Sequence, residues 1–179
     1  VLRLVGSEMC IRDRSGADFR DLDAILLSNL HIDHTGDLPS LIAGSRNLGR
    51  EKALPVLGPA GNEDTISTKT QVERLIGPDG AYPELADFLT FRSLGGYKVS
   101  VREVPAMGSR VWSRFNNRDL KISAVPVYHG GTPTLAWRVE AGAHTIVFAG
   151  DFNNLKDVVA KFAQNADALV VTHALPEGA

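Results

Sequence analysis

The side chains that could bind a metal stand at the ends of expected β-strands, and this placement constrains the fold more than any other feature. Each comes at the end of an apolar run or directly after one. These side chains are His31, Asp33, His34, His129, Asp151 and His173. Sites in sheet proteins are commonly assembled from strand ends and the loops that follow them. Imidazole and carboxylate groups without a thiolate suit zinc, manganese or iron. We therefore expect a metal site along one edge of a sheet.

The first half of the chain has the pattern of strand–helix units. Short apolar runs predict strands at 22–29 and 53–59. Helices are expected at 36–49 and 62–77, and a further short helix after a turn in 77–91. In the helix 36–49, Asp37 is placed to cap the start, Pro39 lies in the first turn and Gly49 can close the end.

The second half of the chain changes to alternating strand patterns separated by turns. The expected strands are 97–104, 110–115, 120–129, 134–142, 144–150 and 167–173. Before the last strand, 152–166 has a helical period, with Leu155, Val158, Val159 and Phe162 on one face. This order predicts an α/β fold, a mixed sheet system with helices outside it.

Composition limits the function classes. The chain has 179 residues, 44% hydrophobic content and a net charge of −2, which indicates one globular domain and argues against a nucleic-acid surface of bulk basicity. Arg46, Arg50 and Lys52 form the nearest basic cluster, which we interpret as a solvated helix end. No apolar run is long enough to span a membrane, and the lone Cys10 excludes an intramolecular disulfide. The compartment stays open between cytoplasm and periplasm.

Each candidate residue also has a simpler interpretation. His31 and His34 could be surface residues of a loop, and His129 or His173 could each bond to a carbonyl at a strand end. Asp151 could cap the following helix, a role we expect in addition to any other. His144 lies in the turn "EAGAHT" and is expected to be exposed and inert. The joint pattern is what favours a metal site.

Three stretches together resemble a known family. "LLSNLHIDHTGDLPSLI" resembles the metallo-β-lactamase signature loop, Thr/Ser-His-x-His-x-Asp-His, "VYHGGTPTLAWRV" its third histidine block and "IVFAGDFNN" its bridging-aspartate block. The match runs from about residue 16 to the C-terminus and is nearest to ribonuclease Z and arylsulfatase-like members. The resemblance implies a four-layer αββα sandwich with a two-metal cleft. It also implies hydrolysis of a phosphodiester, sulfate ester or other ester through a metal-bound hydroxide.

The resemblance also implies a role for each matching residue. His31 and His129 would bind the first metal, Asp33 and His34 the second, and Asp151 would bridge both. The metals would be two zinc ions, with manganese or iron as alternatives. Asp33 would be the catalytic residue, orienting the hydroxide or passing its proton.

The chain departs from the family pattern in three places. Asn29 replaces the first histidine of the signature, and an amide oxygen is a poor zinc ligand, so restoring histidine is expected to strengthen the first site. The final metal histidine of the family is expected beyond "ALVVTHALPEGA". Asn29 and His173 are each expected near the metals, as weak ligands or as neighbours of the ligands. The segment 1–14 resembles translated adapter sequence, with an edge strand "LRLV" as the alternative, and 15–179 is expected to be a partial domain.

Other classes remain as alternatives. The main one is a degenerate, non-catalytic metal- or ligand-binding domain of the same fold, which Asn29 favours. A nucleotide-binding domain lacks its glycine-rich loops, and a serine hydrolase lacks Gly-x-Ser-x-Gly. We expect a small or medium ester substrate in preference to a nucleic acid, which stays open as an alternative. No membrane partner is expected, and the oligomeric state stays open. Aromatic residues of 77–118 are expected to form core or to wall a pocket.

Overall fold

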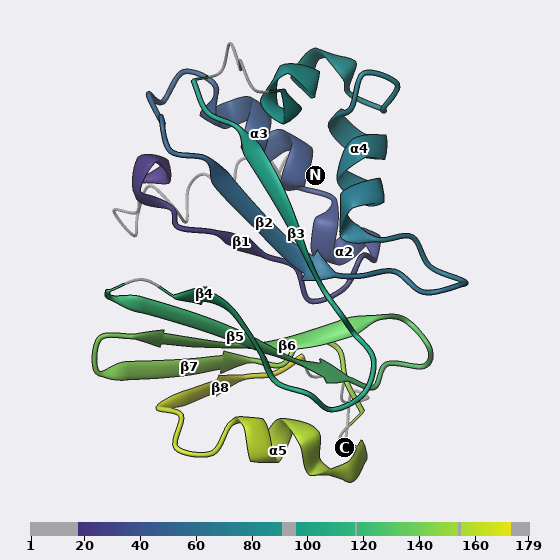
Figure 1. Ribbon diagram of the computed structural model, residues 1–179, viewed down its shortest axis with the longest axis vertical. Coiled ribbons are helices and arrows are strands. Elements are labelled where there is room, and N and C mark those ends of the chain that lie inside the picture. Colours follow the sequence, from purple (N-terminus) through teal and green to yellow (C-terminus); the bar gives the residue numbers. More distant parts are fainter. Residues whose placement is uncertain (1–17, 91–95, 117, 154, 173–179) are drawn as a thin grey trace, which may run out of the picture. The chain divides into compact units, whose positions relative to one another are not determined.

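The computed structural model describes residues 18–90, 96–116, 118–153 and 155–172. These residues form an α/β fold with two sheets and accompanying helices, as predicted (Figure 1). The chain divides into two compact units. The first unit holds the described residues of Val1–Ile25, His31–Leu57 and Lys69–Arg102, and the second those of Leu26–Leu30, Gly58–Thr68 and Glu103–Ala179. The segment 1–14 with Cys10 lies outside the described residues.

A three-stranded sheet has the order β1 (Ile25–Leu26), β2 (Leu54–Pro59) and β3 (Val99–Val104). Every residue of β2 is buried, as its continuous apolar run predicts. Backbone bonds from Leu54 N to Lys98 O and from Ala60 N to Val104 O, both 2.8 Å, flank the β2–β3 pair. The strand predicted at 22–29 is wrong in extent, because only Ile25 and Leu26 pair as a strand.

Five short helices accompany these strands. They are η1 (Phe19–Asp21), α2 (Ile32–Thr35), α3 (Leu38–Ser45), α4 (Thr68–Ile76) and the 3-10 helix η2 (Pro83–Leu89). No described helix is long and apolar enough to cross a membrane. The predicted helix 62–77 starts late because the Asn62 side-chain oxygen accepts the N–H groups of Asp64 and Thr65, which makes a turn in place of a helix.

The helix predicted at 36–49 is also shorter than expected. It ends at Ser45, where the hydroxyl Oγ lies 2.6 Å from both the Ile42 carbonyl oxygen and the Tyr97 hydroxyl. Gly49 has a φ of +73° but lies beyond the helix end, so it does not close the helix. Asp37 occupies the N-cap position as predicted but makes no side-chain capping bond.

Arg50 is buried, so the prediction that the basic cluster is a solvated helix end is wrong for this residue. Its side chain is buried at 3% exposure, and burial lowers the pKa of its guanidinium. The guanidinium lies over the rings of Phe19 and Tyr97. It donates to the carbonyl oxygens of Phe19, Arg20, Lys52 and Ala53. Arg50 therefore joins chain segments inside the first unit.

Aromatic side chains make up part of the core of the first unit. Phe88 and Tyr97 are buried, with ring centroids 4.9 Å apart. Arg46 lies over the Phe88 ring and pairs with Asp87 at 2.8 Å, so α3 is joined to η2. Among the aromatic residues of 77–118, Phe88 and Tyr97 are therefore core residues, whereas Tyr82 is 45% exposed. Phe91 lies outside the described residues.

The second unit contains a five-stranded sheet of order β4-β5-β6-β7-β8. Its strands are β4 (Trp112–Asn116), β5 (Leu120–Val127), β6 (Thr134–Ala141), β7 (His144–Phe148) and β8 (Ala168–Val170). The first four strands pair antiparallel in sequence order, and β8 pairs parallel with β7. The mixed sheet predicted for this half of the chain is confirmed.

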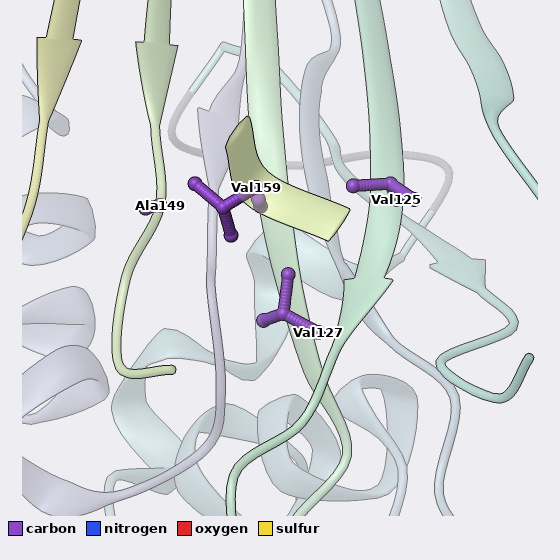
Figure 2. Packing of buried hydrophobic residues seen from close by; sticks show 5 residues of the cluster. Val125, Val127, Ala149 and Val159 are labelled. Carbon is purple, nitrogen blue, oxygen red and sulfur yellow. The ribbon is translucent and has the colours of Figure 1, made fainter. Parts of the chain in front are cut away.

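Helix α5 (Val158–Phe162) covers one face of the five-stranded sheet. Val159 packs in a buried cluster with Val125, Val127, Ala136 and Ala149 (Figure 2). The register pairs Val125 with Ala136, so neighbouring strands contribute to this face.

The helix is shorter than the predicted 152–166. Lys156 and Asp157 of η3 (Leu155–Asp157) have left-handed φ values of 60° and 54°, which interrupt the helical path. Leu155 is 50% exposed, so its predicted place on the apolar face is wrong.

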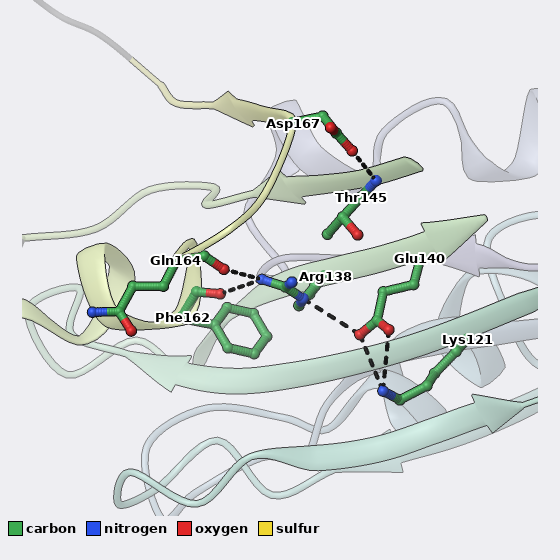
Figure 3. A network of polar contacts seen from close by, with 7 residues as sticks. All are labelled: Lys121, Arg138, Glu140, Thr145, Phe162, Gln164 and Asp167. Atoms are coloured by element: carbon green, nitrogen blue, oxygen red, sulfur yellow. Dashed lines mark hydrogen bonds and ion pairs between the residues drawn. The ribbon is translucent and has the colours of Figure 1, made fainter. Parts of the chain in front are cut away.

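Polar contacts fix the end of α5 to the sheet (Figure 3). Arg138 of β6 donates from Nη1 to the carbonyl oxygens of Phe162 and Gln164 at 2.9 and 3.0 Å. Glu140 lies beside Arg138 and pairs with Lys121 at 3.1 Å. Arg138 therefore joins the end of α5 to β6, and Glu140 joins β6 to β5.

Candidate metal centre

The segment that carries Asn29 is attached to β6. The carbonyl oxygen of Ser28 accepts a bond from the Leu135 backbone N–H at 2.8 Å. One residue earlier, the carbonyl oxygen of Leu27 accepts a bond from the buried indole N–H of Trp137 at 3.0 Å. These two bonds hold the residues that follow β1 against the start of β6, and they place Asn29 at the end of the sheet.

A glycine allows the loop after β7 to approach the same segment. Gly150 has a φ of +63°, a conformation that favours glycine. A Cβ atom at this position would lie 2.7 Å from the Ser28 Cβ atom, which is too close for any side chain. Gly150 therefore lets Asp151, the next residue, come close to Asn29.

The loops after β5 and β7 are joined by a backbone bridge. Asn153 donates its N–H to the carbonyl oxygen of Tyr128 at 2.8 Å. His129 and Asp151 flank this bridge, and the His129 Nε2 atom lies 3.9 Å from the Asp151 Oδ2 atom. Their side chains are 34% and 19% exposed, so both are partly shielded and still accessible.

Asn29 completes this group in the second unit. Its side-chain Nδ2 donates to Asp151 Oδ2 at 3.1 Å, and the residue is fully buried at 0% exposure. Asn29, His129 and Asp151 thus meet at one carboxylate oxygen, although 122 residues separate Asn29 from Asp151 in the chain. No local sequence pattern signals this contact, and from the sequence alone Asn29 is expected to be a weak ligand or a neighbour of the ligands.

The remaining predicted ligands lie in the first unit, around α2. His31 is the N-cap residue of this helix, and its carbonyl oxygen accepts bonds from His34 N and Thr35 Oγ1 at 3.1 and 3.0 Å. His34 Nε2 lies 3.5 Å from Asp33 Oδ2, with side chains 19% and 74% exposed. The predicted loop at 31–34 is therefore a short helix, in which Asp33 and His34 lie together.

The donor atoms fit zinc in type, and the spacing of one of the two pairs is close to that of ligands on one zinc ion. Two ligand atoms bound to one tetrahedral zinc at about 2.0–2.1 Å lie roughly 3.4 Å apart. The separation is 3.9 Å for His129 with Asp151 and 3.5 Å for His34 with Asp33. Each pair brings one imidazole nitrogen and one carboxylate oxygen together within a single unit. The residues present are thus compatible with zinc.

Three further predictions concern His173, His144 and Asp151. His173 lies outside the described residues. His144 is the first residue of β7 and is exposed, in agreement with the prediction that it is exposed. The first helix after Asp151 is η3, which starts at Leu155, and the N-cap residue of α5 is Asp157, so the prediction that Asp151 caps the following helix is wrong.

The family model described as a beta-lactamase superfamily domain matches residues 7–176. Because the match covers most of the chain, the chain belongs to the metallo-β-lactamase superfamily, as its signature loop indicated. Members of this fold family are metal-dependent hydrolases.

Among curated proteins, the chain is similar to enzymes named ribonuclease Z. It is 30% identical over 163 residues to ribonuclease Z of Mycobacterium bovis (strain BCG / Pasteur 1173P2), covering 88% of this chain and 53% of that protein. It is also 30% identical over 154 residues to the putative ribonuclease Z of Mycobacterium tuberculosis, covering 83% and 62%. The chain spans about half the length of the curated relatives it matches. The relationship to ribonuclease Z is therefore distant.

A solved structure shows the same fold. The chain matches a metallo-β-lactamase of Cronobacter sakazakii, a HARLDQ motif mutant, with a TM-score of 0.50 and 19% identity. The match covers 94% of this chain and 64% of the other. The predicted α/β fold of the metallo-β-lactamase type is thus confirmed.

Proposed function

We propose that this chain is part of a zinc-dependent hydrolase that cleaves a phosphodiester, sulfate ester or other ester. The observation that carries the proposal is the approach of His129 to Asp151 at strand ends that the Tyr128–Asn153 bridge joins. Membership of the superfamily supports the reaction class. The chain covers only 53% of the ribonuclease Z of Mycobacterium bovis. The activity of the full-length relatives is therefore proposed for this chain and is not a finding.

In this proposal, His31 and His129 would hold one zinc ion, Asp33 and His34 would hold a second, and Asp151 would serve as a ligand shared by them. Histidine nitrogen and carboxylate oxygen are ordinary zinc ligands, which supports the assignment. Chain connectivity supports the inclusion of His31, because it is only two residues from Asn29. When bound, zinc supplies Lewis acidity that acidifies water and stabilises charge developing on the ester.

Asp33 is the proposed catalytic residue. Its side chain is 74% exposed, so its carboxylate can reach a water or an ester in solvent. A carboxylate in such a position can orient a water molecule or carry its proton during hydrolysis. His34 beside it would limit the orientations available to that carboxylate.

We propose a small or medium ester as the substrate. The net charge of −2 supports this choice, because extended phosphate contacts need clustered lysine and arginine. The two substrate classes can be separated by comparing turnover of an aryl phosphodiester with cleavage of a transfer RNA precursor. Preferential cleavage of the RNA would contradict the small-substrate assignment.

The metal assignment is tested by elemental analysis of the purified chain after loading with zinc or manganese. His34→Ala and Asp151→Ala should each remove most of the bound metal. A matched control is His144→Ala, because His144 is an exposed histidine that the proposal leaves outside the site. Unchanged stoichiometry in both site variants would contradict the assignment.

A second candidate is a non-catalytic metal-binding domain of the same fold. Asn29 favours it, because this buried amide stands where the family signature carries a histidine. The two candidates differ in one measurement. A chain that binds zinc at His129 and Asp151 but does not accelerate hydrolysis of aryl phosphate, sulfate or carboxylate esters is the binding domain.

A further inference from the structure

We propose that Asn29 is a positioning residue that orients the Asp151 carboxylate for metal binding through its side-chain N–H. This inference rests on the proposed function, because it assumes that Asp151 is a ligand. In this role Asn29 does not bind the metal as a weak substitute for the histidine of the family signature.

The geometry of the amide carries this assignment. Asn29 Nδ2 lies 3.1 Å from Asp151 Oδ2, and an ionised carboxylate can only accept hydrogen bonds. The amide must therefore present its nitrogen to Asp151. Amide nitrogen is a donor and does not ligate metals, and the carbonyl oxygen that remains is a poor zinc ligand.

The surroundings of Asn29 fix its side chain in place. The residue is fully buried, and its neighbour Ser28 is bonded to Leu135 N on one side and lies against Gly150 on the other. A rigid donor of this kind restricts the rotation of the carboxylate that it contacts.

The oxygen held by Asn29 is the oxygen that faces His129. Asp151 Oδ2 lies 3.1 Å from Asn29 Nδ2 and 3.9 Å from His129 Nε2. Fixing this oxygen fixes the spacing between the imidazole nitrogen and the carboxylate. Partners that orient ligands in this way commonly contribute about 10–100-fold to metal affinity.

This role reverses the expectation for histidine at position 29. An imidazole is larger than the amide, and the position has no exposed surface into which it could extend. It would also replace the donor that holds Asp151. Asn29→His should therefore bind zinc no more tightly than the parent, whereas the missing-ligand interpretation predicts tighter binding.

The test measures zinc affinity by competition with a chelator, together with the visible spectrum of the Co²⁺-loaded protein. Asn29→Leu keeps the approximate shape of the side chain and removes the donor, and Asn29→Ser keeps a smaller donor. Thr68→Val is the matched control, because Thr68 is also fully buried and its hydroxyl donates to the carbonyl oxygen of Pro59, which is not part of the proposed site.

We expect Asn29→Leu to weaken zinc binding by about 10–100-fold and to change the Co²⁺ spectrum. Asn29→Ser should fall between the parent and Asn29→Leu, and Thr68→Val should match the parent in both readouts. The Co²⁺ spectrum reports ligand geometry, which a loss of folding stability alone would not alter.

Parent-like affinity and spectrum in Asn29→Leu would overturn the inference, and so would tighter zinc binding by Asn29→His. If Asn29→Leu does not fold, weaker zinc binding by Asn29→Ser together with an altered Co²⁺ spectrum supports the inference, and parent-like binding with an unaltered spectrum overturns it. If Asp151→Ala loses zinc but the substitutions of Asn29 leave zinc affinity and the Co²⁺ spectrum unchanged, the inference about Asn29 is wrong and the proposed function still holds. Absence of zinc binding by the parent would overturn both.

Discussion

Asn153 donates its backbone N–H to the carbonyl oxygen of Tyr128, and this bond joins the ends of two strands that are not neighbours in the sheet. Strands β5 and β7 both pair with β6 and not with each other. Their following residues would therefore diverge without a link. The bridge joins the two loops that carry His129 and Asp151, whose side chains approach to 3.9 Å.

Zinc binding should stabilise the folded chain by mass action. At a free zinc concentration about 100 times Kd, a single site that binds only the folded state adds about 2.7 kcal/mol. Tm should therefore rise with added zinc and return to its starting value with a chelator. Differential scanning fluorimetry of the parent and of Asp151→Ala checks this, because a similar rise in both would place the zinc elsewhere.

Gly150→Ala should destabilise the fold and weaken zinc binding. The left-handed φ of +63° costs about 1–2 kcal/mol for alanine, and the new Cβ would also press on Ser28. Gly142→Ala is the control, because Gly142 has a similar φ of +58° and no atom near an added Cβ. Urea unfolding should show the larger loss at Gly150, and equal losses would mean that the contact with Ser28 is unimportant.

Arg138→Met should loosen the C-terminal end of α5. The substitution keeps an unbranched apolar stem in place of the guanidinium side chain and removes its bonds to Phe162 O and Gln164 O. Bonds from a charged donor suggest a loss of about 1.5–3 kcal/mol in unfolding free energy. Lys121→Met, which removes a more exposed ion pair with Glu140, should cost less than about 1 kcal/mol. Faster amide exchange within α5 in Arg138→Met alone would support the assignment.

Tyr97 should make the fold sensitive to alkaline pH. Burial raises the pKa of its phenol above the ordinary value of 10.0, so the unfolded chain loses this proton first. The stability contributed by the neutral phenol is complete below pH 10 and is lost as pH rises through the folded pKa. Tyr97→Phe should show a smaller alkaline loss in urea unfolding than the parent.

The same substitution also has an effect at neutral pH. Tyr97→Phe removes the bond between the phenol and Ser45 Oγ, which should cost about 1 kcal/mol. Tyr82→Phe is the control, because Tyr82 is exposed. An unchanged difference between Tyr97→Phe and the parent across alkaline pH would contradict the role of burial.

Apolar period and turn residues predicted most strands of the fold. The runs at 53–59 and 134–142 correspond closely to β2 and β6, because a buried strand needs apolar side chains and these are visible in the sequence. Helix ends were less predictable. The side chain of Asn62 delays α4, and left-handed residues shorten α5, and neither depends on apolar period.

The candidate site was predictable as residue types and less so as contacts. His129 and Asp151 were expected together from their places at strand ends, and the second unit brings them together. The bond from Asn29 to Asp151 depends on β6 holding Ser28 and on Gly150 admitting the loop, which are tertiary events. Arg50 was misjudged for a similar reason, because only the folded chain supplies the carbonyl groups around it.

The bond from Trp137 to Leu27 gives the protein an intrinsic optical probe. The sequence has two tryptophans, and Trp137 is 2% exposed with its indole bonded to the segment that leads to Asn29. Emission from a buried indole shifts to longer wavelength when water reaches it. Fluorescence of Trp137, read in a Trp112→Phe background, would therefore follow detachment of the Asn29 segment from the sheet.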